Sequence, residues 1–466
     1  MMSPDVSSLR AELTGDVLLP SDAGYEEARR VFNAMIDRRP AVIARCATTA
    51  DVVAAVNFGR DTGLEVSVRC GGHSVAGLSV GDGIMIDLRG LNQIDVDPRA
   101  GIARVGGGVL WGELDGATQE HGLHTPGGRV TTTGIGGFTT GGGYGWTSSK
   151  HGLACDNLVE AEVVTADGAV VTASERENRE LFWGIRGGGG NFGVVTRFDF
   201  QLHPLGPTVL AGLALWPLER VTKVLRGWRD WADAAPDEVS TALVILTAPP
   251  EEFVPPQLRG RTAVGVAAMY VGDPGEGAVP IQPLRDLEPE VDLIHPMPYT
   301  TFQGLLDPMA PPGKRSYWRG EYLAELSGEA VGTFADHAPA VTGGAPPLSQ
   351  VAIFRIGQGV TAVPDDATAF SHREARYLFH PISVWDDAAD DEPVIAANRA
   401  FVEAMRPFGT GGAYLNFTPE ADRVRDAYGA AKHGRLVALK DRYDPENLFR
   451  GNQNVRPSGA WEPALA

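Results

Sequence analysis

The chain has 466 residues, of which 43% are hydrophobic and 21% are charged, and its net charge is −19 at pH 7. This length predicts two or three domains with large cores. The acidic charge argues against nucleic acid and anionic membranes as partners and favours a small-molecule substrate. Three cysteines are too few for a disulfide framework, and we identify neither a signal peptide nor a membrane-spanning stretch. We therefore expect a cytoplasmic protein that is a monomer or a homodimer.

The N-terminal part of the chain alternates between helical and strand patterns. The patterns predict helices at 21–40, 48–63 and 179–187, strands at 40–46, 64–70, 84–97 and 194–204, a strand followed by a helix at 102–122, and a hairpin at 159–174. Thr48 or Thr49 is expected to cap the second helix, which ends near Gly63. The sequence Ala166-Asp167-Gly168 is expected to form the hairpin turn.

After Pro204 the pattern changes to long strands and amphipathic helices separated by proline-rich loops. This favours a second domain with a mostly antiparallel sheet backed by helices on one face. From about Gly411 the density of motifs rises again, which indicates a return to the first domain. We therefore predict an α+β protein with a cofactor-binding part at 1–205, a substrate domain at 206–411, and a returning segment at 412–466.

Four glycine-rich segments stand out, at residues 69–77, 106–108, 127–145 and 186–193. Glycine lets backbone N–H groups come close to a ligand, and successive N–H groups form nests that suit a diphosphate. A single loop of this kind can equally be a tight turn. Four such loops beside strands indicate an extended dinucleotide held between two parts of the chain.

Residues Gly188, Gly190 and Gly193 match the spacing of the nicotinamide-binding fingerprint. That fingerprint requires a strand before it and a helix after it. Here a predicted helix precedes the glycines and a predicted strand follows them. The reversed order excludes a Rossmann site.

His73 and Cys155 are the two reactive side chains next to these loops. A neutral imidazole is a nucleophile, and the 8-methyl carbon of a flavin is an electrophile that it can attack. A loop histidine that only forms hydrogen bonds is the simpler alternative. For Cys155, taken alone, the simpler alternative is an inert buried cysteine.

The motifs GGHS, GGxxxGGGYGW, GLxCDN, RGGGGNFGVVT, YLNF and YDPxNLF occur together in this chain. In this combination the chain resembles the berberine bridge enzyme-like flavoproteins, which belong to the vanillyl alcohol oxidase/p-cresol methylhydroxylase superfamily. It looks most like the bacterial members that oxidise natural-product intermediates. The resemblance implies FAD as cofactor, a two-part FAD-binding domain of the p-cresol methylhydroxylase type, and a double covalent link, from His73 to the flavin 8α carbon and from Cys155 to flavin C6.

With this resemblance, the residues expected to bind FAD besides His73 and Cys155 are Arg69, Cys70, Gly71, Gly72, Ser74, Gly77, Gly136, Gly137, Thr140, Gly142, Gly143, Tyr144, Gly145, Gly190, Asn191, Gly193, Val195, Asn452 and Asn454. Residues expected to line the substrate pocket are Gln350, Gln358 and Tyr144. The pair His121-x-x-His124 has no cysteine or carboxylate cluster near it in the sequence, so we predict no metal site.

The segment 412–417 reads as a strand, which would place Tyr414 and Asn416 on one face. The resemblance implies that Tyr414 is a general base, with Asn416 donating a hydrogen bond to it. Such a phenol needs a pKa below its usual value of about 10 to act near neutral pH. A substrate-positioning or purely structural tyrosine remains the alternative. Our alignment places Ala362 where the plant enzyme of the family has a glutamate base, so that carboxylate is missing here.

These features predict an FAD-dependent oxidase. A hydride passes from an alcohol or amine carbon of a small molecule to flavin N5, and dioxygen reoxidises the flavin and yields hydrogen peroxide. One alternative is a dehydrogenase with another electron acceptor. The other alternative is a flavin protein that binds a drug without turnover.

Overall fold

The computed structural model describes residues 5–252, 254–343, 346–419 and 424–459. Near the N-terminus a four-stranded sheet has the order β1-β2-β4-β3, in which β2, β3 and β4 are parallel and β1 is antiparallel to β2. The strands are β1 (Asp16–Leu18), β2 (Val42–Arg45), β3 (Val66–Arg69) and β4 (Ile84–Asp87). Helices α1 (Ser7–Glu12), α2 (Tyr25–Arg29) and α3 (Thr49–Thr62) accompany this sheet.

Helix α3 has the boundaries expected from its sequence. The Thr48 hydroxyl accepts a hydrogen bond from the backbone N–H of Asp51, which forms a capping box. Gly63 ends the helix in the left-handed conformation at φ +67°. Both predicted helix signals are therefore confirmed.

A second, antiparallel sheet has the order β5-β6-β10-β8-β9. Its strands are β5 (Ile94–Asp97), β6 (Ile102–Gly106), β8 (Leu158–Val164), β9 (Val170–Ser174) and β10 (Val194–Gln201). The short elements near it are α4 (Trp111–Gln119), β7 (Leu123–His124), α5 (Ile135–Thr140), α6 (Ser148–His151), α7 (Arg179–Ile185) and β11 (His203–Pro204). The hairpin at 159–174 is confirmed, since β8 pairs with β9.

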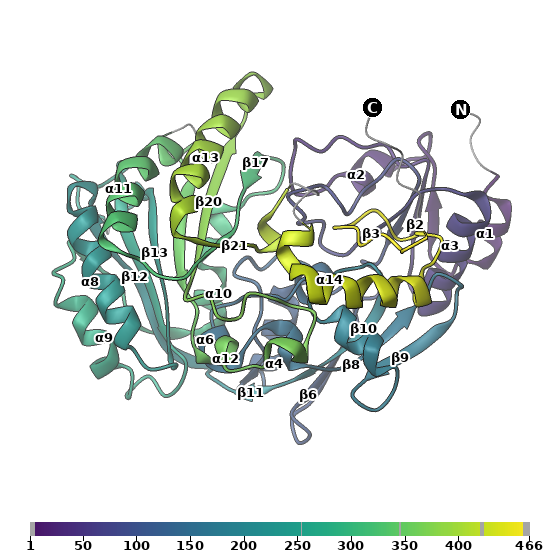
Figure 1. Cartoon of the computed structure of the whole chain (residues 1–466), viewed down its shortest axis with the longest axis horizontal. Helices are drawn as coiled ribbons and strands as arrows, with labels where there is room; N and C mark the ends of the chain where they lie inside the picture. Colours follow the sequence, from purple (N-terminus) through teal and green to yellow (C-terminus); the bar gives the residue numbers. More distant parts are fainter. Residues whose placement is uncertain (1–4, 253, 344–345, 420–423, 460–466) are drawn as a thin grey trace.

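The C-terminal helix α14 (Val424–Tyr443) packs against the same core as the second sheet (Figure 1). Leu436 and Leu439 of this helix join Trp111 and Leu181 in one hydrophobic cluster. The chain therefore returns to its N-terminal part after crossing the large sheet. The exact boundaries at 205/206 and 411/412 stay a prediction.

The middle of the chain forms a ten-stranded antiparallel sheet with the order β15-β12-β14-β13-β19-β20-β18-β21, in which β16 also pairs with β12 and β17 with β20. Its strands are β12 (Thr208–Pro217), β13 (Val239–Thr247), β14 (Thr262–Tyr270), β15 (Val291–Asp292), β16 (His295–Pro298), β17 (Arg315–Trp318), β18 (Glu321–Leu323), β19 (Gln350–Arg355), β20 (Tyr377–Trp385) and β21 (Gly409–Ala413). The helices of this region are α8 (Val221–Ala234), α9 (Ala278–Arg285), α10 (Tyr299–Gln303), α11 (Gly328–Thr342), α12 (Gln358–Thr361) and α13 (Asp391–Met405).

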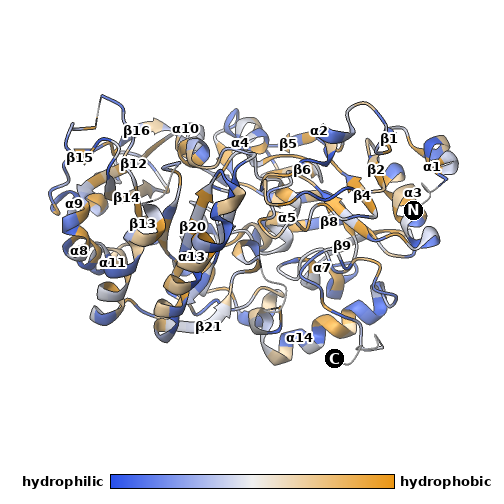
Figure 2. Cartoon of the chain, turned by 90° about the horizontal axis from the view of Figure 1, so that it is seen from above, coloured by the Kyte–Doolittle hydropathy of each residue, from blue (hydrophilic) through white to orange (hydrophobic). Residues whose placement is uncertain are grey.

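Helices α8, α11 and α13 cover one face of this sheet, as expected (Figure 1). Because side chains alternate along a strand, Val351 and Ile353 of β19 face these helices, while Ala352 and Phe354 face the other way. Figure 2 shows the inner strands β4 and β8 mainly in the hydrophobic colour, whereas helices such as α14 show both colours. The face of the large sheet that carries Ala352 and Phe354 packs against Tyr144 and Trp146. This face, called the free face below because the helices do not cover it, is therefore turned towards the N-terminal part.

Three predicted elements differ from the structure. The strand expected at 84–97 is two strands, β4 and β5, which belong to different sheets. The helix expected at 21–40 is confined to Tyr25–Arg29. The chain then leaves the helical conformation. Phe32 stacks on the ring of His73, and the Asn33 amide donates to the carbonyls of Val75 and Ser316. These long-range contacts outweigh the local helical preference.

The strand expected at 412–417 is also wrong in part, because β21 ends at Ala413 and residues Leu415–Phe417 form a 3₁₀ turn. The backbone N–H of Phe417 closes this turn on the carbonyl of Tyr414.

Among the described residues, no helix has both the length and the apolar content needed to cross a membrane.

The buried ion pair between Lys440 and Asp444 gives a test of this architecture. The two side chains are fully buried, 2.6 Å apart, and Asp444 also accepts backbone N–H bonds from Leu448 and Phe449. We expect Asp444→Asn to lower the free energy of unfolding by about 3–5 kcal/mol, because it leaves a buried ammonium without its counter-charge. Urea denaturation measures this loss.

The matched control is Arg38→Ala, which removes an exposed ion pair with Asp82. An exposed pair contributes at most about 1 kcal/mol. If the two variants unfold at the same urea concentration, the buried pair does not stabilise the C-terminal segment as we describe.

Candidate active site

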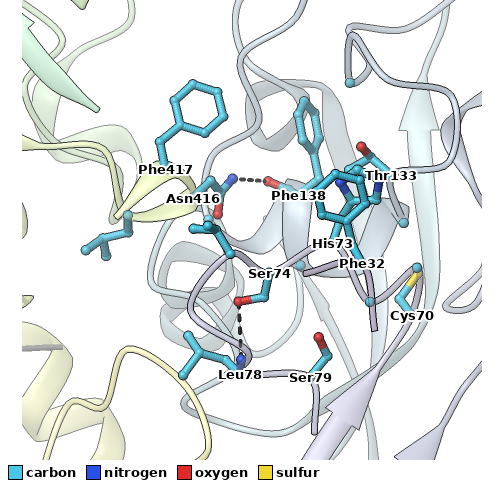
Figure 3. Close-up of a pocket in the computed structure, with 18 of the residues that line it drawn as sticks. Phe32, Cys70, His73, Ser74, Leu78, Ser79, Thr133, Phe138, Asn416 and Phe417 are labelled. Atoms are coloured by element: carbon cyan, nitrogen blue, oxygen red, sulfur yellow. Dashed lines mark hydrogen bonds between the residues drawn. The ribbon is translucent and has the colours of Figure 1, made fainter. Parts of the chain in front are cut away.

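A cavity of about 340 Å³ lies where the glycine-rich loops meet the free face of the large sheet. One wall is built by residues from the loops 70–75, 128–141 and 187–195 and from the segment 449–453. Gln350, Ala352 and Phe354 of β19 and His380 and Ile382 of β20 form the other wall. Figure 3 shows Phe32 and His73 on one side of the cavity and Asn416 and Phe417 on the other.

Glycine is required where two of the loops touch. A Cβ atom on Gly71 would overlap the backbone nitrogen of Gly134, and a Cβ atom on Gly134 would overlap Cys70 Sγ. In contrast, a Cβ atom on Gly137 or Gly190 would meet no atom within 4 Å, although both residues line the cavity. Their bare backbone therefore faces open space, as a close-fitting planar or extended ligand requires.

Several buried polar atoms of the cavity wall have no partner within the described structure. They are Ser79 Oγ, Asn452 Oδ1 and Gln453 Oε1. Buried polar groups normally have a hydrogen-bond partner. Together with the bare glycine backbone, these atoms fit a large polar ligand such as FAD.

His73 lies in the cavity wall immediately after β3, and its ring is held on two sides. Its Nε2 forms a 2.9 Å hydrogen bond with the Thr132 hydroxyl, and its ring stacks on Phe32 at 4.0 Å. Burial lowers the pKa of His73 to about 4, so the ring is neutral at physiological pH. When Nε2–H donates to Thr132, Nδ1 keeps its lone pair for nucleophilic attack.

Cys155 is not brought to this cavity. Its side chain is fully buried in a cluster with Tyr144, Trp146 and Tyr414, and its backbone N–H donates to the carbonyl of Gly142. Burial raises the pKa of the thiol well above its ordinary value, so the reactive thiolate is disfavoured. The thiol link to flavin that the family resemblance implies stays a prediction.

Tyr414 is also set back from the cavity. Its hydroxyl oxygen accepts hydrogen bonds of 3.1 Å from the backbone N–H groups of Gly143 and Tyr144 and from Asn416 Nδ2. These bonds lower its pKa, but burial has the larger effect and raises it to about 12. This direction is opposite to the one expected for a general base.

Asn416 does line the cavity and lies close to Tyr414, as predicted. Its side-chain nitrogen donates to the Tyr414 hydroxyl and to the carbonyl of Phe138 at 3.0 Å (Figure 3). The two residues come together through the 3₁₀ turn and not through a shared strand face. Asn416 thereby ties the C-terminal segment to helix α5.

The other predicted cofactor residues fall into two groups. Those that line the cavity are Cys70, Gly71, Gly72, Ser74, Gly136, Gly137, Thr140, Tyr144, Gly190, Gly193, Val195 and Asn452. Those that lie behind its wall are Arg69, Gly77, Gly142, Gly143, Gly145, Asn191 and Asn454. Asn191, for example, donates to the carbonyls of Gly188 and Gln453 and accepts from Val455 N–H, which makes it a buried connection between segments.

Two assignments for the substrate side need correction. Gln358 lies exposed on α12 and does not line the cavity, whereas Gln350 does. Ala362 follows α12 and is exposed, so it does not occupy a strand position. The cavity face of β19 carries Gln350, Ala352 and Phe354, so a carboxylate is missing there as well.

Sequence reasoning missed Arg129, His380 and Trp318, which also line the cavity. His380 has a local signal, because it alternates with buried apolar residues along β20. Its Nδ1–H donates to the carbonyl of Arg319, and burial lowers its pKa to about 3. Arg129 has only a weak signal, a charged residue between glycines and valine in a loop.

Two family models match the chain. A model described as "FAD binding domain" matches residues 40–174, and one described as "Berberine and berberine like" matches residues 413–456. The first match contains the loops around His73 and Gly137, and the second contains Asn416 and Asn452. Both therefore coincide with walls of the cavity, and the protein binds FAD.

The chain is also similar to characterised proteins over almost its whole length. It is 31% identical to (R)-6-hydroxynicotine oxidase of Paenarthrobacter nicotinovorans, over 96% of this chain and 98% of that protein. The crystal structure of 6-hydroxy-D-nicotine oxidase from Arthrobacter nicotinovorans has a TM-score of 0.86 at 29% identity and covers 98% of this chain and 99% of that one.

The carbohydrate oxidase of Microdochium nivale has a TM-score of 0.82 at 27% identity, with coverage of 96% of this chain and 98% of that one. These similarities extend across the FAD-binding part and the large sheet alike. The chain therefore belongs to the berberine bridge enzyme-like FAD-linked oxidoreductases.

Proposed function

We propose that this protein is an oxidase that removes a hydride from the amine- or alcohol-bearing carbon of a small molecule and passes the electrons to dioxygen. The observation that carries the proposal is the cavity, which joins the loops around His73 to the free face of the ten-stranded sheet. The loops suit FAD, and the sheet face leaves room for a substrate beside it. The similarity to nicotine and carbohydrate oxidases supports the same reaction class.

FAD, when bound, accepts the hydride at N5 and is reoxidised by dioxygen, which takes up two electrons and two protons to give hydrogen peroxide. The protein's part is to fix the cofactor and to exclude competing reactions. His73 is the residue suited to a covalent link, because its ring is neutral, immobilised by Thr132 and Phe32, and free at Nδ1. We propose one link, through His73 alone, because Cys155 does not line the cavity.

The residues of the cavity wall favour an amine over an alcohol as the reacting group. Removing hydride from an alcohol leaves a protonated carbonyl, so a base must take the hydroxyl proton. A neutral amine can release hydride without such a base, because its nitrogen lone pair stabilises the cation that forms. None of the described residues that line the cavity is Asp or Glu, and the pKa of Tyr414 is about 12. We therefore place amines first and alcohols second.

Anaerobic mixing followed by readmission of air tests this function. An amine substrate is expected to bleach the flavin absorbance, and air is expected to restore it with one hydrogen peroxide per substrate oxidised. A dehydrogenase would be bleached but would recover only with an added electron acceptor. A protein that only binds the compound would show a shifted spectrum without bleaching. Either of these two results would contradict the proposal.

His73→Ala is expected to abolish covalent attachment of the flavin. After acid precipitation and centrifugation, the flavin absorbance of the wild type should remain in the pellet, whereas that of the variant should move to the supernatant. Cys155→Ser is the matched control, and it should leave both the pellet and the absorption spectrum unchanged, since its thiol is buried away from the cavity. A changed spectrum in Cys155→Ser would show that the sulfur does bond to the flavin.

Tyr414→Phe distinguishes a base from a positioning residue. Loss of a general base typically slows the chemical step by about 10²–10⁴-fold. We expect a loss of less than about tenfold, from displaced N–H donors of residues 143, 144 and 416, and an unchanged pH profile of anaerobic flavin reduction. Tyr25→Phe is the control for losing a buried hydroxyl, since Tyr25 donates to the carbonyl of Pro40 away from the cavity. A loss of 10²-fold or more, confined to Tyr414→Phe, would restore the general-base role.

A further inference from the structure

Arg129 places a buried positive charge in the wall of the cavity. The residue is 8% exposed and stands between Gly128 and Val130, which also line the cavity. Its two terminal nitrogens donate to the backbone carbonyls of Tyr144 at 3.2 Å and Gly145 at 3.1 Å. Its Nε is buried and has no partner within the described structure. The backbone therefore uses only part of the donor capacity of the guanidinium.

Aromatic rings surround this guanidinium but do not neutralise it. Its central carbon lies 4.6 Å from the ring of Tyr144, 4.8 Å from Trp146 and 4.0 Å from Phe354. Such contacts stabilise a cation but leave its net charge in place. No carboxylate of the described residues forms an ion pair with Arg129 or lines the cavity. A buried charge without a counter-charge is costly, so its retention indicates a ligand that supplies the opposite sign.

The position of Arg129 indicates whether FAD or the substrate supplies the negative charge. The Arg129 guanidinium lies over the ring of Phe354, which belongs to β19, so it faces the wall made by the large sheet. The diphosphate of FAD is expected at the backbone of the glycine-rich loops, whereas the Arg129 side chain extends from its loop towards the large sheet. The counter-charge is therefore expected on the substrate.

We propose, building on the function proposed above, that Arg129 is a specificity-determining residue that binds a carboxylate group of the substrate. A guanidinium can hold a carboxylate through two parallel N–H···O bonds, which fixes its orientation as well as its charge. The aromatic rings restrict the guanidinium to one place, so the carboxylate would set the distance of the reacting carbon from the flavin. The preferred substrate is thus an amine that also carries a carboxylate.

Ligand binding to the FAD-loaded protein tests this inference without turnover. Benzoate and benzamide have nearly the same shape and differ in charge, and each can be titrated while the flavin absorbance is followed. In the wild type we expect benzoate to bind about tenfold or more tightly than benzamide, as charge-assisted hydrogen bonds predict. Arg129→Met should bring the ratio of the two dissociation constants close to one, and Arg129→Lys should keep part of the preference.

Lys314→Met is the matched control. Lys314 is the other lysine or arginine that lines the cavity among the described residues, but it is partly exposed and already paired with Asp386 at 2.6 Å. Its loss should leave the benzoate-to-benzamide ratio unchanged. Comparison with Arg129→Lys guards against misfolding, since that variant keeps the charge and most of the packing.

Three results would overturn the inference. The first is a wild type that binds benzoate no better than benzamide. The second is an Arg129→Met variant that retains flavin and also retains the wild-type ratio, including the case in which only the flavin reduction potential changes. The third is an equal loss of preference in Lys314→Met. None of these depends on bleaching by an amine, so failure of the inference is distinguishable from failure of the proposed oxidase function.

Discussion

The close approach of two loops at Gly71 and Gly134 is the constraint on which the cavity depends. Strand β3 delivers the first loop, and Gly134 stands at the start of helix α5. Because each glycine occupies the space that a side chain of the other would need, any larger residue would force the loops apart. Thr132, two residues before Gly134, would then lose its hydrogen bond to His73. The orientation of the histidine therefore depends on the packing of backbone against backbone.

Two buried cations of the described structure, Lys440 and Arg373, have a carboxylate partner, whereas Arg129 does not. Lys440 has Asp444, and Arg373 has Asp156 at 2.6 Å with both side chains largely buried. Each of these cations also has backbone carbonyls around it. Arg129 has carbonyls and aromatic faces around it but no carboxylate partner in the part of the chain that the structure describes. A buried cation without a carboxylate partner can be retained when a bound ligand supplies the negative charge.

Much of the fold could be predicted from the sequence, because its signals are local. The capping box of α3 and the hairpin of β8 and β9 each depend on residues within a few positions of one another. The placement of His73 next to the cofactor loops followed in the same way, from the glycines around it. Short-range patterns of this kind can be recognised in the sequence without knowledge of any tertiary contact.

The details of the site could not be predicted, because they depend on residues far apart in the chain. The Tyr414 hydroxyl accepts a hydrogen bond from the N–H of Gly143, which lies 271 positions away in the chain. The helix expected at 21–40 is lost to contacts of Phe32 and Asn33 with distant segments. Cys155 carried a family motif, but its side-chain direction depends on the core that it joins. Motifs located these residues near the cofactor without determining which side chains reach it.

The six residues of strand β19 include both positions that pack against the helices and positions that line the cavity. Val351 and Ile353 anchor it to the helical layer, while Gln350, Ala352 and Phe354 form part of the substrate wall. Mutations at the even-numbered positions can therefore change which molecules fit while the odd-numbered positions keep the sheet attached to its helices. Evolution can exchange one set without disturbing the other, so a single scaffold is able to diversify its chemistry through a few neighbouring codons.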